Sequence, residues 1–233
     1  MPSWYKLSKI YVGTNQVRPV LTPSKYVVNS HTLCYLPLTD QTTTTDYWTL
    51  WWTWTKAGSN GWTFIDNYYR SWWNGDYWRL QTGTNAYVNY PTFTFSVWLK
   101  MSSNLNDFIH ISNYGNWDNW NLSLYYNQAR FYSWSTYSYS ISPTLNTGTR
   151  TLLTITYSQS NKWNLYVDWT LRGTRWPTNF NLKPYIAFVN WARLSGGSFS
   201  WDMCYSDYIL EDQEWTAQNV ADYYNANKSN YWL

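Results

Sequence analysis

The chain has 233 residues, of which 44% are hydrophobic and 12% are charged, and its formal net charge is +3. Soluble proteins usually have about 25% charged residues, so neutral polar side chains must cover this surface, as in extracellular and virion β-proteins. The mild charge and the lack of a Lys/Arg cluster argue against a nucleic-acid partner. No stretch approaches the ~20 apolar residues of a membrane span.

Residues 1–30 predict a leader that is distinct from the body. Two extended pieces, KLSKIYV and VLTPSKYVV, flank a turn, and Pro19 and Pro23 favour an arm over a core element. An ordinary N-terminal strand pair is the alternative. No apolar region of a secretory signal is seen, so display on a virion or extracellular surface would use another route. Residues 31–233 are expected to form one domain.

From residue 31 the chain predicts many short strands separated by turn residues. The clearest is TFTFSVWLKM (92–101), in which alternate residues fall on one face. TRTLLTITYSQS and KWNLYVD predict a hairpin that continues through the Asp168–Trp169 turn into TLRGTR, and SFSWDMCYSDYIL ends the series. Residues 41–75 are expected to be a long loop with one or two short strands.

The last segment, LEDQEWTAQNVADYYNAN, has helical periodicity. Asp212 is the expected N-cap, and Glu211 and Glu214 at the helix start suit its dipole. Many short strands followed by one short C-terminal helix predict an all-β fold, a two-sheet antiparallel sandwich of jelly-roll type. The apolar positions of the helix are Trp215, Val220, Ala221 and Tyr224.

Tryptophan is unusually frequent, with 20 Trp against 10 Gly. A two-residue hairpin turn normally reads Asp-Gly because both central residues need φ > 0, which costs a large L-residue about 1–2 kcal/mol. We hypothesise that UGA codons meaning glycine are written here as Trp, at Trp169 among others. The alternative is a truly Trp-rich protein with exposed aromatic platforms. Similar loop contexts hold Trp72, Trp117, Trp120, Trp134, Trp191 and Trp201, whereas Trp98, Trp163 and Trp215 fit strand or helix patterns and are expected to be genuine.

The order of these stretches resembles the laminin-G-like branch of the concanavalin A-like lectin/glucanase superfamily over residues 31–227. LCYLPLTD resembles its opening strand, and LQTGTNAYVNY before TFTFSVWLK resembles its aromatic-strand block. LLTITYSQSNKWNLYVDWTLRGT resembles a hairpin that normally reads Tyr-Val-Asp-Gly, and SFSWDMCYSDYILEDQEWTAQNVADYYNA resembles its closing strand and helix. Trp169 and Trp201 depart from the pattern as Trp for Gly. The resemblance implies that the first and last body strands are neighbours, with Cys34 near Cys204, both as thiols.

Catalysis is not indicated. Glycosidases need paired carboxylates, and those of this superfamily carry Glu-x-Asp-x-x-Glu on one strand, whereas Glu211 and Glu214 both fall on the terminal segment. His31 and His110 have no nucleophile nearby in sequence, and no nucleotide-binding glycine pattern occurs. We therefore expect neither an enzyme nor a cofactor.

Calcium is the one metal that the resemblance suggests, because laminin-G-like domains often hold Ca²⁺ at the sandwich rim. Calcium takes six or more oxygen ligands, but no ligand spacing is recognisable here. Solvated turn acids are the simpler interpretation. The acids near predicted loops are Asp40, Asp46, Asp66, Asp118 and Asp202.

Sugar recognition uses aromatic faces together with amide and carboxylate groups. The loop SNYGNWDNWNLSLYYN and the tract RFYSWSTYSYSI combine these types, although Tyr-rich strands are also ordinary in polar-surfaced β-proteins. One face of the second tract belongs to the core, so only the other could bind. The predicted ligand-binding residues are Tyr114, Asn116, Trp117, Asp118, Asn119, Trp120, Tyr137 and Tyr139.

The sequence therefore predicts a non-catalytic binding or adhesion module that recognises a glycan or another surface ligand within a virion or cell-surface assembly. Other structural subunits would contact residues 1–30, and a homo-oligomer is compatible with this arrangement. The alternative is a purely structural phage tail, head-fibre or decoration subunit. A glycan hydrolase ranks third.

Overall fold

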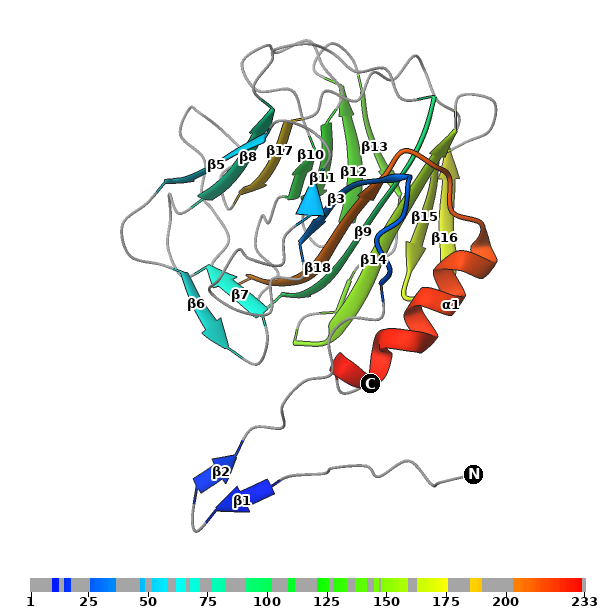
Figure 1. Ribbon diagram of the computed structural model, residues 1–233. Helices are drawn as coiled ribbons and strands as arrows, with labels where there is room; N and C mark the ends of the chain where they lie inside the picture. The colour runs from blue at the N-terminus through cyan, green and yellow to red at the C-terminus, as the bar shows by residue number, and fades with distance from the viewer. Residues whose placement is uncertain are drawn as a thin grey trace.

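The computed structural model describes residues 26–36, 91–101, 145–146, 148–158, 163–175 and 203–231, together with the backbone of the other strands named below. The strands form two large antiparallel sheets and one separate hairpin, β1 (Ile10–Val12) with β2 (Asn15–Val17) (Figure 1). One short helix, α1 (Ala217–Asn227), follows the last strand and runs into the 3-10 turn η2 (Lys228–Tyr231). The predicted all-β, two-sheet fold with a C-terminal helix is confirmed.

The first sheet contains most of the described side chains. Strand β7 (Tyr68–Ser71) also joins it by pairing with β18 (Met203–Glu211), and β6 (Trp62–Ile65) pairs with β7. Its main strand order is β16 (Thr170–Arg175), β15 (Trp163–Val167), β14 (Arg150–Ser158), β9 (Thr92–Met101), β18 (Met203–Glu211), β3 (Thr32–Leu36) and β4 (Tyr47–Trp48).

The second sheet consists of shorter strands. The segment 41–75 contributes four strands to the two sheets, not the one or two expected, because its Thr, Trp and Tyr residues suit a pleated surface more than a loop. The strand order is β13 (Tyr137–Ile141), β12 (Gln128–Ser133), β11 (Asn121–Tyr125), β10 (Ile109–Ile111), β17 (Tyr185–Val189), β8 (Tyr77–Thr82) and β5 (Trp52–Ala57).

Strand β9 is buried on both faces. Phe93, Phe95, Val97 and Leu99 lie on one face, as the alternation predicts, and all are buried. Trp98 projects from the opposite face, where it packs with residues of α1, and it is also fully buried. The core on this helix side consists of Tyr35, Trp98, Leu152, Tyr166, Ile209, Trp215, Val220, Tyr223 and Tyr231.

Helix α1 begins later than the sequence predicts. Its N-cap is Thr216, whose side chain accepts a 3.2 Å hydrogen bond from the Asn219 amide, and Asn219 accepts one of 3.0 Å from the Thr216 amide. This reciprocal capping box satisfies the first helical turn. The prediction of Asp212 as N-cap is wrong because β18 extends to Glu211, and the chain then crosses the sheet before it turns into the helix.

The two cysteines lie on neighbouring strands but at different positions along them. Strand β3 pairs with β18, as the resemblance implies, and Cys34 is a buried thiol. Its cross-strand partner is Leu210, whereas Cys204 faces Lys100 of β9. The six residue-to-residue steps from 204 to 210 span about 20 Å of strand, well beyond the ~7 Å limit for a disulfide. The expectation that the two cysteines are near neighbours is therefore wrong.

Candidate functional site

The predicted ligand-binding residues fall into two groups. Those in segment 114–120 lie outside the described residues, as do the five aspartates considered for calcium, so these assignments stay predictions. Tyr137 and Tyr139 belong to β13, the edge strand of the second sheet. Being two residues apart on one strand, they share a face.

Strand register shows which face of the second sheet Tyr137 and Tyr139 occupy. Tyr139 is opposite Phe131, Phe131 is opposite Leu122, and the same row continues to Ile111 and Ile186. The register therefore places Tyr139 in a row of apolar residues. The role of Tyr137 and Tyr139 as ligand contacts remains a prediction.

The other face of the same three strands carries polar residues. Asn121, Tyr132 and Ser138 form one row across β11, β12 and β13, and Ser123, Arg130 and Ser140 form the next row. Strand β11 begins immediately after the predicted binding loop. Asn121 and Arg130 were not among the candidates from the sequence, and Tyr132 was considered only as one aromatic residue of the tract, although the alternation in NLSLYYNQARFYS separates the three from Leu122 and Phe131. Amide, guanidinium and phenol groups are suited to binding hydroxyl-rich ligands.

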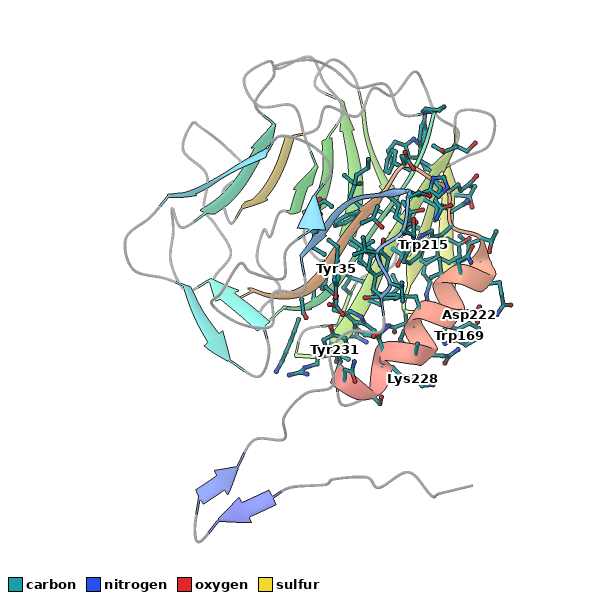
Figure 2. All side chains as sticks on the ribbon, viewed as in Figure 1. Tyr35, Trp169, Trp215, Asp222, Lys228 and Tyr231 are labelled. Atoms are coloured by element: carbon teal, nitrogen blue, oxygen red, sulfur yellow. The ribbon has the colours of Figure 1, made fainter. Side chains whose placement is uncertain are left out.

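The tip of the β15–β16 hairpin exposes an indole. Trp169 is 56% exposed and Leu171 is 49% exposed (Figure 2). Asp168 has a φ of 57°, whereas Trp169 does not have positive φ. The expectation that both turn residues need φ > 0 is wrong for Trp169, and the left-handed position falls on Asp, which tolerates it better than most residues.

Two hydrogen bonds fix this tip to the neighbouring strand. The Asp168 amide donates to the Leu152 carbonyl at 2.7 Å, and the Leu152 amide donates to the Asp168 carboxylate at 3.1 Å. Burial raises the pKa of Asp168, although the Leu152 amide and the nearby Arg172 oppose that shift. The tip is therefore a fixed element, and an indole at position 169 would be held as an exposed platform.

Asp207 is a buried carboxylate that sequence reasoning did not anticipate. It lies in a β-bulge, where Asp207 and Tyr208 together oppose a single residue of β9, and its φ is 47°. Bulges of this kind redirect a side chain. The carboxylate accepts hydrogen bonds from three hydroxyl groups: those of Tyr35 at 3.2 Å, Tyr223 at 3.2 Å and Tyr231 at 2.6 Å. Because all four residues are buried, this cluster ties α1 and η2 to the sheet.

Glu211 is the second buried carboxylate. Its predicted position was the helix start, but it ends β18 and is 1% exposed. Its donors are Tyr26, Asn29, Gln213 and Trp215. Neither buried carboxylate presents an oxygen to solvent, so both serve packing. Among the described residues no cluster of three His, Cys, Asp or Glu side chains is placed to hold a metal, and no helix is long and apolar enough to span a bilayer.

The two-sheet β-sandwich fold is shared with solved structures of low sequence identity. It is similar to the structure of botulinum neurotoxin type C, whose cell entry depends on two ganglioside molecules, at 16% identity and a TM-score of 0.65 over 84% of this chain and 51% of the other. It is also similar to the botulinum neurotoxin DC binding domain solved with rat synaptotagmin II, at 16% identity and a TM-score of 0.65 over 86% and 52%.

A third similar structure is the serotype D ligand-binding domain solved with N-acetylneuraminic acid, at 16% identity and a TM-score of 0.63 over 84% and 50%. The chain spans about half the length of these neighbours. No protein-family model and no curated protein matches it.

Proposed function

We propose that this chain is a non-catalytic binding or adhesion module that recognises a glycan or another cell-surface ligand. The observation that carries the proposal is the fold, which 85% of the chain shares with the receptor-binding domain of botulinum neurotoxin C/D mosaic serotype at a TM-score of 0.66. The three neighbours described above interact with gangliosides, with synaptotagmin II and with N-acetylneuraminic acid, respectively.

The contact surface that we propose is the polar face of β11, β12 and β13. Its residues supply the groups that a sugar requires: an aromatic ring at Tyr132 for the apolar side, and an amide at Asn121 and a guanidinium at Arg130 for hydroxyl or acidic groups. The predicted loop 114–120 precedes this face and would extend it.

We further propose that the module acts within a virion or another extracellular surface assembly, in which residues 1–30 contact other structural subunits. The low charged fraction of 12% supports this setting. The laminin-G-like affiliation belongs to the same proposal, since it implies a module of this kind.

The test is binding of the full-length chain to a panel of neutral and sialylated glycans, with the products analysed for cleavage. We expect binding to a subset of glycans without hydrolysis. Tyr132→Ala and Asn119→Ala should each weaken binding about tenfold, as interface contacts do when truncated. Asp222→Ala, an exposed residue of α1, is the matched control and should bind normally. Absence of binding to any glycan or cell surface, or release of glycan fragments, would contradict the proposal.

A further inference from the structure

The segment Tyr26–His31, called the strap below, is held against the end of β18. The Tyr26 hydroxyl donates to Glu211 Oε1 at 2.6 Å, and Asn29 Nδ2 donates to the same oxygen at 2.9 Å. At the far end of the strap, the Asp212 amide donates to the His31 carbonyl at 3.0 Å, and His31 Nδ1 lies 2.9 Å from Asp212 Oδ1. The strap is thus fixed to residues that lie about 180 positions away in sequence.

The other oxygen of Glu211 holds the chain that leads into α1. Gln213 Nε2 donates to Oε2 at 2.7 Å, and the indole N–H of Trp215 donates to the same atom. Within the described part of the chain, no Lys or Arg forms an ion pair with Glu211. A buried carboxylate without a cationic partner is tolerated only when hydrogen-bond donors surround it. Glu211 therefore needs donors from both the strap and the helix lead.

The Tyr26 ring reinforces this link. It lies 4.8 Å from the ring of Tyr35, 6.4 Å from that of Trp215 and 6.3 Å from that of Tyr223, measured between ring centroids. Burial, together with the hydrogen bond to Glu211, raises the pKa of Tyr26 well above its usual range. The strap thus closes one end of the core beneath α1.

We propose that Glu211 couples the strap to helix α1, so that displacing either one loosens the other. The carboxylate has one oxygen for each side, and losing the donors on one side leaves a buried charge that the other side alone must stabilise. Coupling of this kind is reciprocal by thermodynamic necessity. A partner that binds the chain preceding Tyr26 and displaces the strap would then loosen α1, because both are held by the carboxylate oxygens of Glu211. This role is independent of ligand recognition by the second sheet.

Two full-length variants test the coupling from opposite sides. Tyr26→Phe removes the strap hydroxyl, and Trp215→Phe removes the indole N–H of the helix lead, while both keep an aromatic ring. The measurement is amide hydrogen exchange at Thr32, which donates to the Asn29 carbonyl, and at Val220, which donates to the Thr216 carbonyl. We expect the exchange rate to rise roughly threefold to tenfold at both amides in both variants. An increase of this size corresponds to the loss of one hydrogen bond.

The control is Glu214→Gln, which removes a negative charge three residues from Glu211 and should leave both amides unchanged. Glu211→Gln, which replaces one acceptor oxygen by a donor, should accelerate both amides together. If Tyr26→Phe changes only Thr32 and Trp215→Phe changes only Val220, the two sides are independent and the coupling is wrong. Unchanged exchange at Thr32 in Tyr26→Phe would show that Glu211 does not hold the strap. Neither result bears on glycan binding, so this proposal and the proposed function can fail separately.

Discussion

The hydroxyl of Tyr231 donates a 2.6 Å hydrogen bond to the carboxylate of Asp207, and both residues are buried. This bond joins η2 at the end of the described chain to the bulge in β18. Since Tyr35 and Tyr223 donate to the same carboxylate, Asp207 connects β3, α1 and η2 to one point of the sheet.

Asp207→Ala should lower the free energy of unfolding by about 3 kcal/mol or more, because it removes one acceptor from three buried hydroxyls and places Ala at a left-handed φ. Urea denaturation followed by fluorescence measures the change. Asp222→Ala on the exposed side of α1 should stay within about 0.5 kcal/mol of the parent. A loss below about 1 kcal/mol at position 207 would show that the cluster contributes little to stability.

Stability should fall at alkaline pH. Burial, followed by the charge of Asp207, raises the pKa of Tyr231 well above 10.0, so the folded state holds this proton more tightly than the unfolded state. Its contribution is therefore complete below about pH 10 and is lost as the pH rises further. The urea midpoint, measured in steps from pH 7 upward, should remain level and then decline. In Tyr231→Phe the decline should be smaller, and an equal decline would assign it to other groups.

Truncation of two tryptophans should change the free energy of unfolding by very different amounts. Trp98 is fully buried and stacks on Tyr231 at 4.3 Å and on Tyr224 at 5.6 Å, so Trp98→Ala should cost about 3–5 kcal/mol. Trp169→Gly should change stability by less than about 1 kcal/mol because the indole is exposed and the hydrogen bonds of the tip belong to Asp168. Thermal unfolding of both variants provides the comparison. A large loss at 169 would mean that the fold depends on this indole.

The hypothesis of reassigned UGA codons predicts glycine at position 169. Mass spectrometry of the peptide that reads NLYVDWTLR here, taken from protein of the native source, measures the residue directly. Glycine would remove the exposed platform and leave the second sheet as the binding surface. Tryptophan would contradict the hypothesis at this position and add the hairpin tip to the candidate ligand contacts. The three tryptophans expected to be genuine, Trp98, Trp163 and Trp215, are all buried, as packing would require of them.

Periodicity predicted the strands and the hairpin because alternation is a local property. The strand 92–101 and the turn at Asp168 were located correctly for this reason. The bulge at Asp207 was not predicted, since DMCYSDYIL continues to alternate plausibly on either side of it. The cysteine prediction failed for a related reason: adjacency of strands follows from topology, whereas register depends on bulges and partners that are remote in sequence.

The candidate site was harder to predict than the fold. Sequence reasoning selected aromatic residues by type, and only pairing between strands shows that Tyr139 shares a row with Phe131 while Tyr132 shares one with Asn121. The N-cap was misplaced because Glu211 and Asp212 have the composition of a helix start. Glu211 instead ends β18 and Asp212 follows it, and the two side chains form hydrogen bonds with Tyr26 and His31, respectively.

The position of β18 in the first sheet has a consequence for biosynthesis. This strand lies between β9 and β3, so the last strand along the sequence separates two that are made much earlier. During synthesis β9 and β3 each have one unpaired edge until β18 has been made, and exposed edges of this kind can pair with other chains. Ribosome-bound chains that stop before residue 203 should thus be digested readily by protease, whereas chains that have emerged past α1 should resist it.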